Sequence, residues 1–129
     1  MKGFFKNIEK ATHENTDYRR VLYTAKNCQL VLMNLAPSEE IGKEVHTVDQ
    51  FFRFESGAGQ VFIDSNEYSV GDGDTIIVPA GSQHNVINTS AENPLKLYTI
   101  YSPPHHKDGT MHKTKADESE EHFDGTTTE

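Results

Sequence analysis

A single cysteine, Cys28, stands among the 129 residues of the chain. One thiol cannot form an intrachain disulfide, and its isolation excludes a zinc site built from several cysteines. The residue lies at the edge of an apolar run, so we expect its side chain to be buried and chemically inert.

Long apolar runs are also missing. The longest nearly apolar stretch, residues 30–36, is far shorter than the roughly 20 residues that a membrane-spanning helix needs. The N-terminus carries no secretory hydrophobic region, which makes a cytoplasmic protein without a membrane partner the default expectation. The chain has no internal repeat and no long amphipathic helix.

Basic residues are outnumbered, since 12 lysines and arginines face 20 aspartates and glutamates for a formal net charge of −8. An acidic chain without a basic stripe is a poor binder of nucleic acid, and we expect no such partner. Half of the net charge lies beyond residue 112. We therefore predict a single domain over residues 1–112 and a solvated, disordered acidic tail over residues 113–129.

Short β-branched and aromatic runs alternate with Gly, Pro, Asn and Asp, which is typical of an all-β sandwich or barrel. Residues 3–10 give only a weak signal, for a strand or a short helical turn, and residues 113–116 are compatible with a short helix. The barrel core is expected over about residues 18–104. The predicted strands are residues 18–25, 29–36, 44–46, 50–55, 59–63, 67–70, 75–78, 84–89 and 95–102.

The most informative stretch is residues 73–88. It reads Gly73, five residues, Pro79, one residue, Gly81, two residues, His84, three residues and Asn88. Proline and glycine mark a turn after an apolar run, and His84 then begins a second β-rich run. This placement suits a metal ligand or an acid–base group.

Alternation along the strands indicates which side chains face the barrel interior, because successive side chains point to opposite faces. Gln50 shares a face with Phe52 and Phe54, and His84 shares a face with Val86. If the apolar members face the core, Gln50 and His84 face it too. The neighbouring Asp49 then points the other way.

Glu44 and His46 are two residues apart, so on one strand they share a face, and a turn before Gln50 brings that residue alongside. The candidate metal ligands are therefore Glu44, His46, Gln50 and His84. Two imidazoles, a carboxylate and an amide oxygen suit a first-row divalent transition metal better than calcium. The set also resembles the two-histidine, one-carboxylate sites of non-heme iron proteins.

The spacing of these residues resembles the two sequence motifs of the cupin family. Residues 73–88 match the second cupin motif at each defining position. The first motif matches in part, with His46 on its second histidine, Gln50 on its glutamate and Gly57 on its closing glycine, whereas Glu44 replaces its first histidine. The resemblance covers about residues 18–104. Within it, residues 49–53 and 79–81 resemble those of bacterial cupins labelled phosphomannose isomerase-like.

The resemblance implies an all-β double-stranded β-helix, or jelly roll, with a divalent metal (Fe, Mn, Ni or Zn) inside one open end. The implied function is a metal-dependent enzyme acting on a small polar metabolite such as a sugar or sugar acid, by isomerase or lyase chemistry. An iron-dependent dioxygenase and a non-catalytic ligand-binding cupin are the alternatives. Glu44 is a candidate catalytic residue, as a ligand or a general base, and a homodimer is expected.

The remaining candidates have structural interpretations. Asn88 is expected to hold a turn or line the barrel, and Tyr98 and Tyr101 either line the pocket or pack. Gly57, Gly73, Pro79 and Gly81 shape turns. Three histidines follow the break at Pro103–Pro104 and are expected at the surface near a flexible end, outside the ligand set: His105, His106 and His112.

Overall fold

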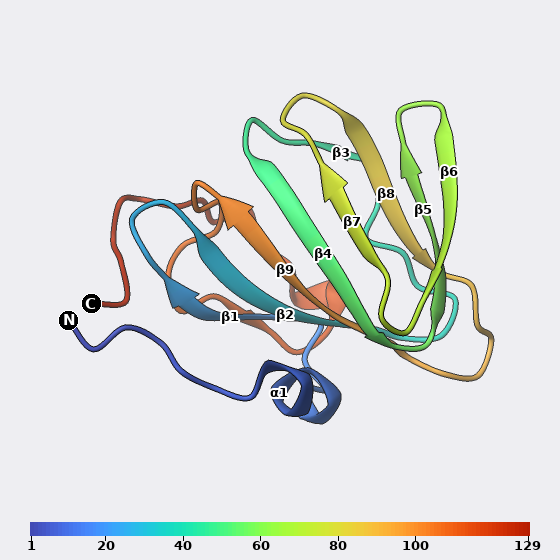
Figure 1. Cartoon of the computed structure of the whole chain (residues 1–129), viewed down its shortest axis with the longest axis horizontal. Helices are drawn as coiled ribbons and strands as arrows, with labels where there is room; N and C mark the ends of the chain where they lie inside the picture. The colour runs from blue at the N-terminus through green and yellow to red at the C-terminus, as the bar shows by residue number, and fades with distance from the viewer.

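The computed structural model describes all residues 1–129, and two antiparallel β-sheets packed face to face make up most of it (Figure 1). Ten strands, one α-helix and one 3-10 helix follow the order α1 (Ile8–Glu14), β1 (Arg19–Thr24), β2 (Gln29–Leu35), β3 (Glu44–Val45), β4 (Asp49–Ser56), β5 (Ala58–Ile63), β6 (Asn66–Gly71), β7 (Thr75–Val78), β8 (Gln83–Asn88), β9 (Leu95–Ser102), β10 (Met111–His112) and η1 (Lys115–Asp117).

The first sheet has six strands in the order β10-β1-β2-β9-β4-β7, and the second has four in the order β3-β8-β5-β6. The chain crosses between the sheets repeatedly, as a jelly roll requires. The predicted all-β jelly-roll fold is confirmed. The weak signal near residues 3–10 corresponds to α1, which Asn7 caps by accepting a hydrogen bond from the Lys10 amide at 3.0 Å.

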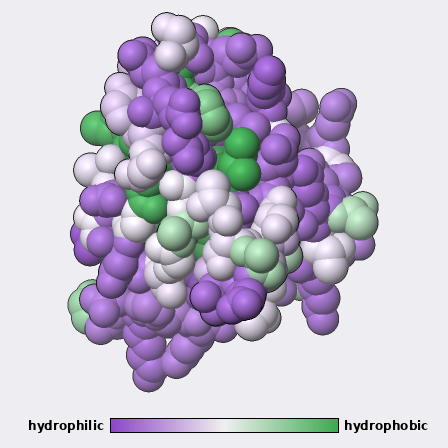
Figure 2. Space-filling view, turned by 90° about the vertical axis from the view of Figure 1, so that its right-hand side faces the viewer, coloured by the Kyte–Doolittle hydropathy of each residue, from purple (hydrophilic) through white to green (hydrophobic).

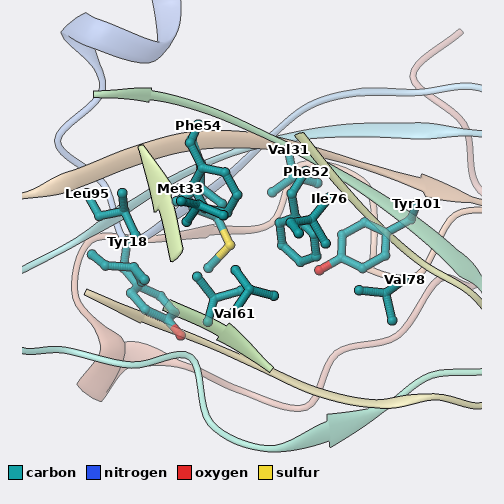
Figure 3. Close-up of a cluster of buried hydrophobic side chains, with 14 of the residues drawn as sticks. Tyr18, Val31, Met33, Phe52, Phe54, Val61, Ile76, Val78, Leu95 and Tyr101 are labelled. Carbon is teal, nitrogen blue, oxygen red and sulfur yellow. The ribbon is translucent and has the colours of Figure 1, made fainter. Parts of the chain in front are cut away.

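The core fills the space between the two sheets (Figure 3). Phe52 and Phe54 of β4 are fully buried and stack with ring centroids 6.3 Å apart, as the alternation along this strand predicts. Tyr101 and Val78 lie at one end of the cluster, and Tyr18 and Leu95 lie at the other. Burial of such side chains is the main stabilising contribution to the fold.

Cys28 is exposed, so the prediction that it is buried is wrong. It lies in the hairpin between β1 and β2, where the Ala25 amide donates to the Cys28 carbonyl at 2.9 Å. A tight turn of this kind projects its side chains into solvent.

The C-terminal segment, predicted as a disordered tail, instead lies against the barrel. The Thr128 amide donates to the Thr24 carbonyl at 2.9 Å, and the Glu129 carboxylate accepts from the amides of Lys2 and Gly3 at 2.6 and 3.0 Å. The chain ends consequently lie close together (Figure 1). Specific hydrogen bonds, which composition does not reveal, hold this segment.

No helix of the structure has the length and apolar character needed to span a membrane.

Candidate metal centre

His84 begins the site at the start of β8, directly after the turn at residues 79–82. Gly81 adopts a φ of +90° in this turn and donates its amide to the His46 carbonyl at 2.8 Å, which joins the two motif segments. His84 is 4% exposed, as predicted for an inward-facing residue. Its Nδ1 lies 3.1 Å from the Ser82 carbonyl oxygen. Because that oxygen only accepts, Nδ1 carries the proton and Nε2 keeps its lone pair free.

Glu44 lies opposite His84, since β3 pairs with β8 in a register that places these two residues together. The strand ends at Val45, one residue earlier than predicted, and His46 follows it. Glu44 Oε2 lies 2.7 Å from His46 Nε2, and the His46 and His84 ring centroids are 5.1 Å apart. One ligand atom from each of the three residues lies within 4.8 Å of the others.

The short contact between Glu44 and His46 is not a hydrogen bond. His46 Nε2 is buried and has no hydrogen-bond partner, although the carboxylate oxygen is 2.7 Å away. The two atoms are therefore in contact without the direction of a hydrogen bond. A buried nitrogen without a partner is costly, and a cation bound between these atoms would satisfy it. The residues present fit a metal ion.

The protonation states suit such an ion. Burial opposes ionisation of Glu44, but its contact with His46 and the charge of Arg19 hold the pKa of Glu44 below its ordinary value. Burial lowers the pKa of His84, and the Ser82 carbonyl only partly offsets this. An ionised carboxylate and a neutral imidazole are the forms that bind transition metals.

Gln50 of β4 is 3% exposed and faces inward with Phe52, as predicted. Its Nε2 donates to Thr99 Oγ1 at 3.0 Å, which fixes the amide, while its Oε1 is buried without a partner. That oxygen is free to accept. Asp49 points to the opposite, exposed side and accepts from the Ala80 amide at 2.9 Å, in agreement with the alternation.

The histidines after Pro104 do not lie at the surface as predicted. The His105 ring centroid is 4.3 Å from that of His46, and His106 and His112 are 8% and 6% exposed. The buried Gln29 side chain binds this segment, since its Oε1 accepts from the amides of His105 and His106 at 3.2 and 2.9 Å. Burial lowers the pKa of His105 to about 4 and that of His106 to about 2.

Tyr101 packs beside these rings, with its centroid 5.2 Å from His105 and 6.0 Å from His46. Its hydroxyl lies 3.3 Å from His106 Nε2. The Tyr98 side chain points the other way, since it lies on the outer face of the sheet against Phe51. Of the two tyrosines predicted to line the pocket or to pack, Tyr101 supports the site and Tyr98 does not. No spacing in the sequence distinguishes them beyond the alternation of β9.

A cavity of about 530 Å³ adjoins Glu44 and His46. His84 lines a second cavity of about 410 Å³. The C-terminal segment forms part of the wall of the larger cavity, where Glu118 binds the buried Arg19 at 2.7 Å. The lining of the larger cavity is Arg19, Glu44, Val45, His46, His105, His106, Glu118, Ser119, Glu120, Glu121 and His122.

This fold and this arrangement of side chains define a small β-barrel protein of the cupin class. The protein-family model of the cupin domain matches residues 31–101 of the sequence. The chain therefore belongs to the cupin family.

Its relatives extend this assignment along most of the chain. The protein YrkC of Bacillus subtilis is 48% identical in an alignment of 123 residues, which covers 90% of this chain and 66% of that protein. The crystal structure of BH2720 from Bacillus halodurans superposes with a TM-score of 0.87 and 43% sequence identity. The match covers 90% of this chain and 92% of the BH2720 chain. KdgF from a Halomonas species shares the fold, with a TM-score of 0.67 and 18% sequence identity. The match covers 84% of this chain and 97% of the KdgF chain.

Proposed function

We propose that this chain is a metal-dependent cupin enzyme whose site binds one divalent transition metal, with Fe, Mn, Ni and Zn as candidates. Glu44, His46 and His84 are the proposed ligands, and Gln50 is the proposed fourth. The observation that supports this most strongly is the approach of three ligand atoms to within 4.8 Å around a buried His46 Nε2 that has no other partner.

The donor set favours a first-row transition ion, because imidazole nitrogens dominate over carboxylate oxygens. Such an ion would supply Lewis acidity to a carbonyl, hydroxyl or carboxylate of the substrate. The protein holds its ligands firmly. Ser82 orients His84, and Thr99 orients Gln50. Ligands fixed in this way by neighbouring groups keep their geometry without reorganisation.

The substrate is proposed to be a small polar molecule in the adjoining cavity. About 530 Å³ falls within the range of small-molecule pockets, roughly 300–1,000 Å³. His46 and His105 line this cavity with polar rings, and Glu44 supplies an ionised carboxylate beside it. A carboxylate there can also accept a proton from a substrate carbon or hydroxyl, which supports isomerase or lyase chemistry.

The variant Glu44→Gln tests the role of this carboxylate. As a ligand, Glu44 contributes the one negative charge of the set, so the variant is expected to bind Mn²⁺ or Zn²⁺ at least about 10-fold more weakly. The measurement is metal affinity by competition with a chromogenic chelator. Asp49→Asn, which removes an exposed carboxylate pointing away from the site, is the matched control and should bind metal as the wild type does. Unchanged affinity in Glu44→Gln would contradict the assignment of Glu44 as a ligand.

A homodimer is also proposed, through the outer face of the six-stranded sheet. An apolar row crosses this face, since Leu30 pairs with Ile100, Ile100 with Phe51, and Phe51 with Ile77. Ile77 is 63% exposed at the edge strand β7. By contrast, the side of the molecule next to β6 is largely hydrophilic (Figure 2). Exposed apolar rows of this kind mark interfaces.

Substitution of Ile77 by glutamate should convert the dimer to a monomer, because a charge would be buried at the interface. The measurement is molar mass by size-exclusion chromatography with light scattering. Tyr68→Glu, on the edge strand β6 of the other sheet and 45% exposed, is the control and should leave the mass unchanged. A monomeric wild type, or a dimer that withstands Ile77→Glu, would contradict this interface.

A further inference from the structure

We propose that Arg19 binds a carboxylate of the substrate in the cavity beside the metal ligands, and that Glu118 occupies this position until the substrate displaces it. The ligand class is then a small acid, with a carboxylate for Arg19 and hydroxyl or carbonyl oxygens for the metal. This assignment rests on the proposed function of the cavity as a metal-dependent small-molecule site. Residues 118–122, called here the strap, form one wall of that cavity and carry Glu118.

Arg19 is a charged residue at an inward position of the barrel. It begins β1 and shares the inner face with the buried Val21, whereas Arg20 between them is exposed. The Arg19 side chain is 3% exposed and still lines the cavity. Arginine is almost never buried unless its charge is matched by a partner. The fold therefore commits a buried positive charge to this cavity.

The protein uses only part of the Arg19 guanidinium. Nη1 donates to Glu118 Oε2 at 2.7 Å and lies 3.4 Å from His112 Nδ1. Nε is buried and has no hydrogen-bond partner. A guanidinium can hold a carboxylate through two parallel hydrogen bonds, and a buried donor without an acceptor is costly. Arg19 thus keeps a donor that Glu118 does not satisfy and that a carboxylate bound through both of its oxygens would satisfy.

Glu118 is the weakly held member of this ion pair. Its side chain is 35% exposed, and only Oε2 bonds to Arg19. The residues of the strap are all exposed, and backbone hydrogen bonds hold it at its two ends, from the Glu118 amide to the Lys115 carbonyl at 3.0 Å and from the Phe123 amide to the His105 carbonyl at 2.9 Å. A segment with so little buried surface opens at low cost. A competing carboxylate can therefore displace Glu118 while the barrel stays folded.

The cavity offers such an acid two points of attachment. Arg19 lines the same volume of about 530 Å³ as the proposed metal ligands Glu44 and His46, so a small molecule can reach both. A carboxylate is the group that Arg19 already binds in the structure. Glu120 and Glu121 lie on the strap, so its displacement also moves their charges away from the entering anion.

Gluconate and its neutral counterpart glucitol provide the test. Their dissociation constants are measured by calorimetry on Zn²⁺-loaded wild type, Arg19→Met and Glu118→Gln. We expect gluconate to bind at least about 10-fold more weakly to Arg19→Met and about 10-fold more tightly to Glu118→Gln, and glucitol to change by less than about 2-fold in both. Both variants break the same ion pair. An ion pair that only supports the fold would change gluconate binding in the same direction in both, whereas competition gives opposite directions.

The matched control is Glu121→Gln, which removes the same charge from the same strap at a residue that does not pair with Arg19. It should tighten gluconate binding by less than about 3-fold, because an exposed charge acts weakly through solvent. In the Arg19→Met background, the gain from Glu118→Gln should shrink to the gain seen in this control. If Arg19→Met does not fold, the comparison of the two exposed glutamate variants still tests the proposal.

Equal gains from Glu118→Gln and Glu121→Gln would overturn the assignment, as would a gain from Glu118→Gln that persists without Arg19. Absence of gluconate binding to both the wild type and Glu118→Gln would overturn it too. Metal content separates the two proposals. A protein that binds no metal contradicts the proposed function, and the opposite effects of the two variants should then remain on the metal-free protein. Full metal occupancy without these opposite effects contradicts only the role of Arg19.

Discussion

The double variant His46→Ala/His84→Ala is expected to purify without stoichiometric metal and to lose more than about 1,000-fold in metal affinity. Both imidazoles of the proposed ligand set are removed, and Glu44 and Gln50 alone offer one charged and one neutral oxygen. Loss of even a residue that only supports a ligand typically costs about 10- to 100-fold, so loss of two ligands should cost more.

Two measurements together check this expectation. Elemental analysis gives the metal content of the purified proteins. Thermal unfolding with added Zn²⁺ or Mn²⁺ gives a second readout, because a ligand that binds only the folded state stabilises it by about 2.7 kcal/mol at 100 times its dissociation constant. The melting temperature of the wild type should rise with added metal, and that of the double variant should not.

The control is His13→Ala, which removes an exposed histidine of α1. His13 lies with Glu9 and the buried Glu55 in a second group of potential ligand atoms within 4.8 Å of one another. Metal that persists in the double variant and disappears in His13→Ala would move the metal site to that group. Metal lost only from the double variant places it between β3 and β8.

The sequence predicts the barrel well because local rules determine it. Period-two alternation places Gln50, Phe52 and Phe54 on one face, and the structure buries all three. Turn residues mark the strand ends, so that the predicted strand 75–78 coincides with β7. The inward direction of His84 follows from the same alternation. Each of these features depends on neighbours in the chain.

The surroundings of the site could not be predicted in this way. The position of His105 depends on the hydrogen bond that its amide donates to the side chain of Gln29, 76 residues away, and the position of Glu118 depends on Arg19, 99 residues away. Neither contact leaves a periodic signal. Acidic composition favours disorder on average, but the ion pair to the buried Arg19 and backbone hydrogen bonds such as that from Phe123 to His105 hold this segment. The wall of the cavity therefore lies in the part of the chain for which composition predicted no structure.

The largest stability effect is expected from Gly57→Ala, at the closing glycine of the first motif. Gly57 joins β4 to β5 with a φ of +101°, and a Cβ there would lie 2.5 Å from the Pro94 carbonyl oxygen and 3.1 Å from Leu95 Cα. Both atoms belong to the backbone that leads into β9, so neither can move aside as a flexible side chain would. A positive φ costs about 1–2 kcal/mol for alanine, and overpacking adds about 1–3 kcal/mol. The free energy of unfolding should fall by about 3 kcal/mol.

Gly73→Ala separates the two causes. Gly73 has a similar φ of +88°, but a Cβ there would meet no atom within 4 Å. This variant carries the backbone strain without the clash, so it should lose only about 1–2 kcal/mol. Urea unfolding at equilibrium measures both values, and their difference isolates the contact with residues 94 and 95. Equal losses would mean that the motif requires glycine at position 57 for its backbone conformation alone. A larger loss at Gly57 would show that this position also determines how closely the β4–β5 connection packs on the start of β9. That strand carries Thr99 and Tyr101 to the site.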